Sequence, residues 1–115
     1  MKNKDITLRF RVVNKDIFFA IKEGRKKIET RAATEKYRKI EVGDTLKFTC
    51  GKMSFKKKAK KITHFSSVCA LLKNYAPNEI NPNARSENEL RRMYYTYPEY
   101  KEKIRKYGIV AWELK

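Results

Sequence analysis

The sequence contains few of the residues that build metal centres or disulfide frameworks, and it lacks a long apolar run. It has two cysteines and one histidine, and no stretch approaches the roughly 18 apolar residues of a membrane-spanning helix. Cys50 and Cys69 fall on apolar faces of predicted elements, which indicates buried free thiols in a reducing cytoplasm. His64 has no ligand partner at a metal-binding spacing. We therefore expect a cytoplasmic protein with no metal, no cofactor and no membrane partner.

Acidic residues are scarce as well. The chain has 13 Asp and Glu against 29 Lys and Arg, a formal net charge of +16. The excess is concentrated in residues 1–61, which hold 20 basic and 7 acidic residues, whereas residues 62–115 hold 9 and 6. So much positive charge repels itself in a compact domain and is favourable mainly beside a polyanion. The charge predicts a nucleic-acid partner, with a solubility role as the alternative.

Glycine and proline are few, and no linker or repeat interrupts the chain. The 4 Gly and 3 Pro are scattered, and 41% of the 115 residues are hydrophobic. A chain of this length and composition can build one modest core but is too short for two. We expect a single domain that spans residues 1–115.

The hydrophobic periodicity alternates between the period of a strand and that of a helix, which predicts an α+β fold. Segments 32–41 and 77–85 have no clean period and are expected to be loops. The expected strands are 7–13, 27–31, 45–50, 55–65 and 109–114, and the expected helices are 15–23, 68–75, 86–97 and 98–107.

The strand at 55–65 is unusual because it carries five lysines. Its inward-facing set changes parity between Ala59 and Ile62, which predicts a β-bulge. So many lysines are not expected in a strand that is flanked on both sides. They either protect an exposed sheet edge from pairing with other chains or contact nucleic acid.

The densest polar pattern is the run from Gly24 to Arg31, Gly-Arg-Lys-Lys-Ile-Glu-Thr-Arg. In a strand Glu29 and Arg31 share one face, and Lys26 can join them only if the turn after Gly24 re-aims its side chain. Lys and Arg together can hold a phosphate, and Glu can align them or accept a donor from a nucleobase. The alternative is a solvated ion-pair cluster without function.

These residues resemble a known family signature. The pattern Gly24-x-Lys26-x-x-Glu29-x-Arg31 is similar to the G-x-K-x-x-E-x-R signature of the ASCH domain (activating signal cointegrator homology), a member of the PUA-like superfamily. The order of predicted elements after it extends the resemblance over nearly the whole chain. The resemblance implies a small mixed or antiparallel PUA-like β-barrel with three to four helices at its side and mouth, and a charged cleft that binds RNA.

Candidate contacts for RNA combine this signature with basic and aromatic side chains elsewhere. The stripe of Leu90, Met93, Tyr94 and Tyr97 on the 86–97 helix is expected to pack in the core. No recognition helix for a DNA groove is evident, and tyrosines beside a concave site suit splayed RNA bases, so RNA is preferred to DNA. A protein partner remains an alternative. The predicted RNA- or phosphate-binding residues are Arg9, Arg11, Lys26, Glu29, Arg31, Arg38, Arg92 and Tyr95.

The resemblance also leaves an enzyme open. Some ASCH-like proteins are similar to amidohydrolases of acetylated cytidine, and others to ribonucleases. Lys26 matches the lysine of the amidohydrolase pattern, but Glu29 stands where that pattern has Thr, and Asn83 and Ala84 occupy the stretch of its later acid. A small hydrolase could still use a desolvated Lys26 as base and Glu29 to move a proton.

Overall fold

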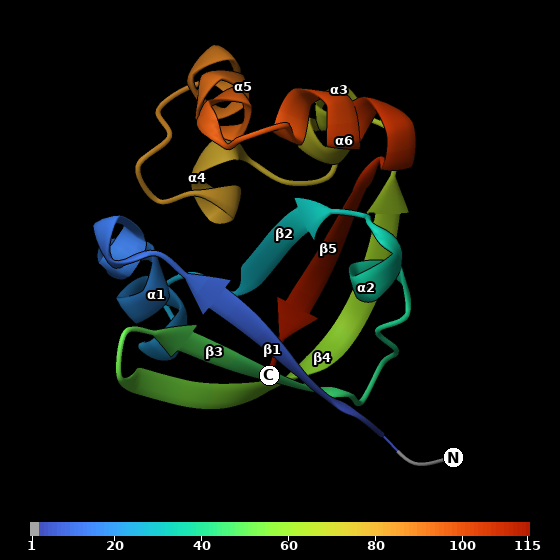
Figure 1. Cartoon of the computed structure of the whole chain (residues 1–115). Coiled ribbons are helices and arrows are strands. Elements are labelled where there is room, and N and C mark those ends of the chain that lie inside the picture. Colours follow the sequence, from blue (N-terminus) through green and yellow to red (C-terminus); the bar gives the residue numbers. More distant parts are fainter. Residues whose placement is uncertain (1–2) are drawn as a thin grey trace.

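A five-stranded mixed sheet organises the protein in the computed structural model, which describes residues 3–115. The strand order is β1-β3-β4-β5-β2; β1 pairs with β3 in parallel and all other neighbours are antiparallel. The sheet curls into a half-barrel, so its two end strands approach each other across an open seam (Figure 1). The strands are β1 (Asp5–Phe10), β2 (Ile28–Ala32), β3 (Thr45–Cys50), β4 (Met53–Phe65) and β5 (Ile109–Leu114).

Six α-helices surround this half-barrel within residues 3–115, more than the three to four expected. The two additional ones, α2 and α4, are single turns in segments predicted to be loops, and one turn is too short to show a helical period. Helices α4, α5 and α6 lie on one side of the sheet and α1 lies beside the seam (Figure 1). The helices are α1 (Lys15–Lys22), α2 (Glu35–Arg38), α3 (Val68–Leu72), α4 (Pro77–Ile80), α5 (Glu87–Thr96) and α6 (Tyr100–Tyr107), preceded by a 3-10 turn η1 (Val12–Asn14).

Two hydrophobic cores share strand β5. Val110 and Trp112 belong to the core inside the half-barrel, whereas Ile109 and Ala111 belong to the core between the sheet and helices α3–α6. All four side chains are buried, because each face of β5 packs into one of the two cores. The strand expected at 109–114 is therefore a central strand, paired with β4 on one side and β2 on the other, with apolar residues on both faces.

Strand β4 forms a hairpin with β3, and its pairing register shifts between Ala59 and Lys61, where the bulge was expected. It is not an end strand of the sheet, because it lies between β3 and β5. Within residues 3–115, however, each half of β4 pairs with a strand on one side only, so no part of it is flanked on both sides. Residues 53–58 pair with β3 and residues 59–65 pair with β5, so the bulge lets one bent strand serve two partners.

Two local expectations were also wrong. Strand β1 ends at Phe10, short of residue 13 where it was expected to end, and Val12 is 66% exposed in the 3-10 turn. Cys69 is exposed because its neighbours Val68 and Leu71 turn the apolar side of the short helix α3 toward the sheet; Cys50 is buried as expected.

No helix within residues 3–115 has the length and apolar character needed to cross a membrane.

Candidate functional site

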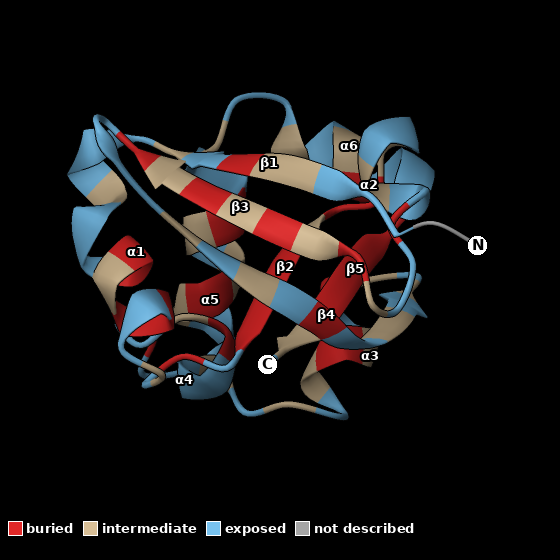
Figure 2. Cartoon of the chain, turned by 90° about the horizontal axis from the view of Figure 1, so that it is seen from below, coloured by how far each residue is buried: buried red, intermediate tan, exposed pale blue. Residues whose placement is uncertain are grey.

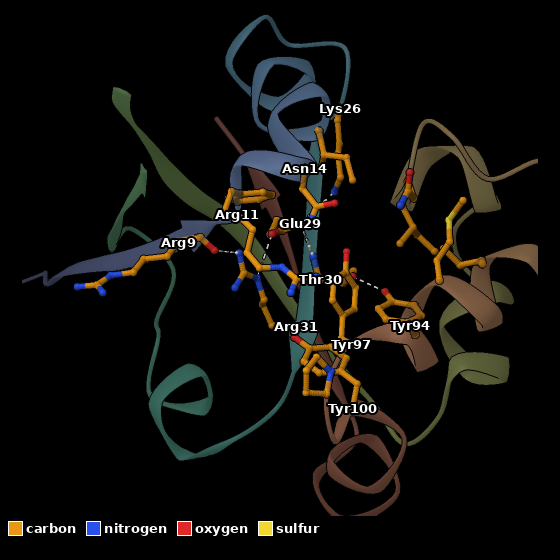
Figure 3. Close-up of a pocket in the computed structure, with 17 residues that line it drawn as sticks. Arg9, Arg11, Asn14, Lys26, Glu29, Thr30, Arg31, Tyr94, Tyr97 and Tyr100 are labelled. Atoms are coloured by element: carbon orange, nitrogen blue, oxygen red, sulfur yellow. Dashed lines mark hydrogen bonds and ion pairs between the residues drawn. The ribbon is translucent and has the colours of Figure 1, made fainter. Parts of the chain in front are cut away.

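A pocket of about 350 Å³ lies at the seam of the half-barrel (Figure 3). One wall is charged and comes from β2 and the turn before it, with Lys26, Glu29 and Arg31. The opposite wall comes from the α5–α6 region and carries three tyrosines, Tyr94, Tyr97 and Tyr100. The pocket therefore combines ionised groups on one side with aromatic rings on the other.

The turn after Gly24 re-aims Lys26 toward this pocket, as the sequence argument required. Gly24 has a φ of 83°, and the main-chain N–H of Lys26 donates to the carbonyl of Ala20 at 2.9 Å. Lys26 Nζ donates to the carbonyl of Ile28 and, at 3.1 Å, to Glu29 Oε1. Burial, with the nearby charge of Arg31, lowers the pKa of Lys26 despite the attraction of Glu29. Lys26 is thus a buried amine that is more easily deprotonated than a surface lysine.

Glu29 is the centre of the charged wall. Its Oε1 accepts from Lys26 and from the main-chain N–H of Thr30 at 3.2 Å, and its Oε2 accepts from Arg31 Nε at 3.1 Å. Burial alone would raise the pKa of Glu29, but the charges of Lys26 and Arg31 outweigh it and hold the pKa below its usual value. The carboxylate is therefore ionised, and the three residues together carry one excess positive charge.

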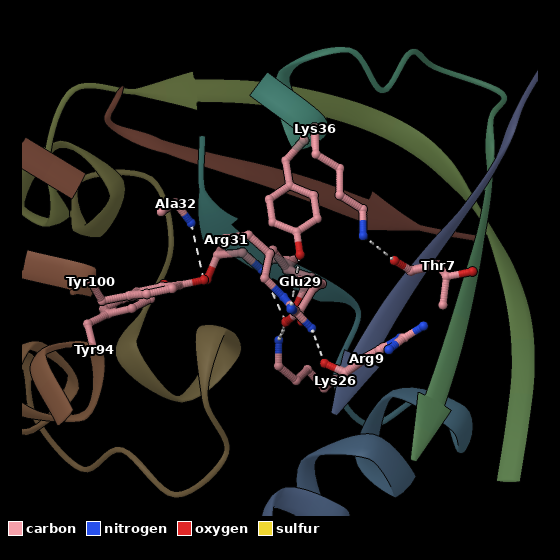
Figure 4. Close-up of polar contacts among 12 residues, drawn as sticks. Thr7, Arg9, Lys26, Glu29, Arg31, Ala32, Lys36, Tyr94 and Tyr100 are labelled. Carbon is pink, nitrogen blue, oxygen red and sulfur yellow. Dashed lines mark hydrogen bonds and ion pairs between the residues drawn. The ribbon is translucent and has the colours of Figure 1, made fainter. Parts of the chain in front are cut away.

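Arg31 uses its guanidinium largely within the protein (Figure 4). Besides its bond to Glu29, it donates through Nη1 to Tyr37 Oη at 3.5 Å and through Nη2 to the carbonyl of Arg9 at 3.2 Å. It also lies over the rings of Phe10 and Tyr37, 5.0 and 5.8 Å from their centroids. The planar fork expected to hold a phosphate is mostly occupied, so Arg31 has a structural role at the seam.

The tyrosine wall is tied to β2 by hydrogen bonds. The hydroxyl groups of Tyr94 and Thr30 bond to each other, and the main-chain N–H of Ala32 donates to Tyr100 Oη at 3.4 Å. Burial raises the pKa of Tyr94, Tyr97 and Tyr100, so their hydroxyl groups stay protonated and can donate. The expectation that Tyr94 and Tyr97 serve only as core was incomplete, because both line the pocket. Their hydroxyl groups within an apolar stripe were the signal in the sequence for a partly polar wall.

The floor of the pocket includes the free edge of β2. The bonds from Leu114 N to the Lys27 carbonyl and from Ala33 N to the Gly108 carbonyl, both 2.9 Å, set the phase of the ladder with β5. In an antiparallel ladder alternate residues then turn their main-chain groups away from the partner strand. Thr30 is such a residue, and it lines the pocket. Its N–H already donates to Glu29 Oε1 at 3.2 Å, so the carbonyl of Thr30 is the main-chain group that can meet a ligand.

The other predicted site residues divide into two groups. Arg9 and Arg11 border the pocket, although Arg9 contributes its carbonyl while its side chain extends away from Arg31 (Figure 3). Arg38, Arg92 and Tyr95 are exposed and lie outside the pocket lining. Helix α5 turns Leu90 and Tyr94 inward, so Arg92 and Tyr95 face solvent on its other side.

The fold and the site together define a class of small α+β protein in which a half-barrel holds a charged and aromatic pocket at its seam. The chain is similar to the crystal structure of hypothetical protein PH0355, with 32% identity, a TM-score of 0.80, and coverage of 99% of this chain and 98% of that one. It is also similar to the solution NMR structure of protein PF0455 from Pyrococcus furiosus, with 31% identity, a TM-score of 0.73, and coverage of 96% of each chain.

The chain belongs to the same family as PH0355 and PF0455. No protein-family model and no curated protein sequence matches it. Because the names of the two related proteins specify no activity, the function has to be argued from the site.

Proposed function

We propose that the protein is an RNA-binding module that takes a splayed base into its pocket. The observation that carries this proposal is the pocket of about 350 Å³, in which a charged wall faces a wall of tyrosines. Tyrosine rings suit the flat face of a base, and the carbonyl of Thr30 with Glu29 Oε2, which accepts one bond from Arg31, suits the donors on its rim. Sequence-specific RNA recognition commonly uses this combination of stacking and edge bonding.

The charge of the protein supports a polymer over a free nucleoside. The charged wall holds one excess positive charge, and the whole chain carries +16. An extended positive field attracts a chain of phosphates and adds little to the binding of a small neutral ligand. Arg11, which is exposed at the pocket border, is the candidate for the phosphate next to the bound base.

We also assign the chain to the ASCH type within the PUA-like superfamily. The support is the position of the signature residues: Lys26, Glu29 and Arg31 all line the pocket, on the edge strand β2 and the turn before it, in a curled sheet with helices beside it. A protein partner in place of RNA would leave a pocket of this depth and polarity without an evident use.

A second candidate is a small hydrolase, and one observation favours it. Lys26 is 3% exposed, its pKa is lowered mainly by burial, and it lies beside Glu29, so a neutral amine could act as a base. Against the amidohydrolase pattern, Asn83 donates to Asp16 Oδ2 at 2.7 Å on the protein surface. The later acid of that pattern therefore has no counterpart at this position.

Two tyrosines of the α5 region provide a matched test of RNA binding. Tyr97 lines the pocket, whereas Tyr95 is 45% exposed and lies outside it. We expect Tyr97→Ala to weaken the binding of short single-stranded RNA about tenfold, since base stacking on an aromatic residue contributes about 1–3 kcal/mol. Tyr95→Ala should leave the affinity unchanged. Equal effects of the two substitutions in fluorescence anisotropy would exclude the pocket as the RNA site.

For the hydrolase, labelled RNA and acetylated cytidine would be incubated with wild-type protein and with Lys26→Met. This substitution keeps the length of the side chain but removes the amine. Turnover by the wild type that is lost in a folded Lys26→Met variant would support catalysis by Lys26. Equal turnover by both proteins, or by neither, would exclude it.

A further inference from the structure

A second charged surface lies on the outer side of the sheet, away from the pocket. We call it the open face. In the half formed by β1, β3 and the beginning of β4, the inward side chains Leu8, Leu46 and Phe48 are fully buried. No helix of residues 3–115 covers the outward side (Figures 1 and 2). The open face consists of nine outward positions: Asp5, Thr7, Arg9, Thr45, Lys47, Thr49, Ser54, Lys56 and Lys58.

Apart from the carboxylate of Asp5, every side chain on the open face either is a cation or carries a hydroxyl group. Lys47 lies directly opposite Lys56 in the antiparallel register of β3 and β4. Like charges placed directly opposite each other in a sheet are destabilising. Asp5 lies 3.5 Å from Lys56 and offsets part of this charge. Within residues 3–115 the side chains of Arg9, Lys47 and Lys58 form no ion pair, and a bound anion would relieve the repulsion.

The chemistry of the open face selects its partner. Interfaces with proteins have an apolar core, but none of the nine positions carries an apolar side chain. Phosphate and sugar oxygens, in contrast, accept hydrogen bonds from Lys, Arg, Ser and Thr side chains alike. A nucleic-acid backbone fits this composition better than a protein surface does.

Arg9 connects the open face with the pocket. Its carbonyl accepts from Arg31 Nη2 at 3.2 Å on the pocket side, whereas its side chain extends away from Arg31 (Figures 3 and 4). In the register of β1 and β3, Arg9 lies beside Thr49 on the open face. An RNA strand that leaves the pocket can therefore reach the open face by passing over Arg9 alone.

We propose that the open face binds the sugar-phosphate backbone of the RNA whose base enters the pocket, without reading its sequence. This inference rests on the proposed function for the identity of the polymer. It assigns to the lysines of β3 and β4 a binding role separate from base recognition. The tyrosine pocket would then select the RNA, and the open face would extend the length of strand that is bound.

The test compares two double variants with the same charge change. Lys47→Gln with Lys56→Gln removes two cations from the open face, and Lys101→Gln with Lys106→Gln removes two exposed cations from α6. The probe is an unstructured RNA homopolymer of about 20 nucleotides, whose affinity is measured over a series of salt concentrations. Each lost phosphate contact on a single strand lowers the log-log salt slope by about 0.7, so we expect a decrease of about 1.4 and at least about tenfold weaker binding at low salt.

The α6 variant should retain the wild-type slope, and a decrease of the same size in both variants would overturn the inference. The variant loses both the Lys47–Lys56 repulsion and the exposed Asp5–Lys56 pair, and exposed pairs add little stability. The melting temperature should therefore stay close to that of the wild type, so misfolding will not imitate the result. Tyr97→Ala separates the two proposals. If it has no effect while the open-face variant lowers the slope, the pocket proposal fails and the open face stands. If Tyr97→Ala weakens binding while the open-face variant keeps the wild-type slope, the open face fails and the pocket proposal stands.

Discussion

The side chain of Arg31 on β2 donates to the main-chain carbonyl of Arg9 on β1 at 3.2 Å, and this bond joins the two end strands of the half-barrel. A second bond of the same kind, from Lys36 Nζ to the carbonyl of Thr7 at 3.1 Å, lies farther along the seam (Figure 4). Side chains therefore bridge the seam in place of a main-chain ladder between β1 and β2. The space left between the end strands is where the pocket forms.

Replacement of Arg31 by lysine tests this bridge. Lysine keeps the charge but lacks the planar fork that reaches Glu29, Tyr37 and Arg9 together. We expect Arg31→Lys to lower the free energy of unfolding by about 1–3 kcal/mol in urea. The control is Arg25→Lys, because Arg25 forms an exposed pair with Glu23 at 2.8 Å and should cost less than about 0.5 kcal/mol. Similar losses in both variants would contradict the bridging role.

The pKa of Glu29 predicts a particular dependence of stability on pH. Its folded-state pKa is held below the ordinary value of 4.5, so its ionisation stabilises the fold fully above that pH and loses this effect as pH falls through the folded pKa. At neutral pH, Glu29→Gln should cost about 3 kcal/mol because it leaves the buried Lys26 and the partly buried Arg31 without their anionic partner. The difference in the free energy of unfolding between wild type and variant should become smaller below pH 4.5. A gap that stays constant in urea titrations down to about pH 3 would refute the assignment.

The hydrogen bond between Thr30 and Tyr94 predicts strong coupling between two residues that are 64 positions apart. Thr30→Val leaves the buried Tyr94 hydroxyl without this partner, and Tyr94→Phe does the same to Thr30, so each should cost about 1–3 kcal/mol. The double variant removes both polar groups and should cost less than the sum, by about 0.5–3 kcal/mol. A double-mutant cycle measures this difference, and simple additivity would show that the bond does not couple α5 to β2.

Gly108, between α6 and β5, should tolerate no side chain. It has a φ of 79° and a ψ of -162°, and a Cβ atom there would overlap the carbonyl oxygen of Phe65. We expect Gly108→Ala to cost several kcal/mol, beyond the roughly 1–2 kcal/mol of a left-handed backbone alone. Gly51→Ala is the matched control, since its φ is 60° but no atom lies within 4 Å of the added Cβ. Equal melting temperatures of the two variants would contradict the steric argument.

Local patterns in the sequence were sufficient for much of the fold. The alternation of Leu46, Phe48 and Cys50 marked β3, and the change of parity after Ala59 marked the bulge in β4. The helices expected at 68–75 and 86–97 begin beside Ser67 and Ser86, and each serine accepts a bond from the main-chain N–H three residues later, at 3.1 Å. These features could be predicted because each depends on residues that are close together along the chain.

Composition and the spacing within one short segment were also enough to predict the positive charge and the grouping of Lys26, Glu29 and Arg31. Other features follow from the assembled fold: Arg31 spans the seam, Tyr94 and Tyr97 form a pocket wall, and Arg38, Arg92 and Tyr95 lie outside it. They could not be predicted because a pocket forms where elements distant in the chain approach without filling the space between them. Burial and hydrogen bonding across such a gap depend on the curl of the sheet and the placement of helices. The hydrophobic periodicity of a sequence reports on neither.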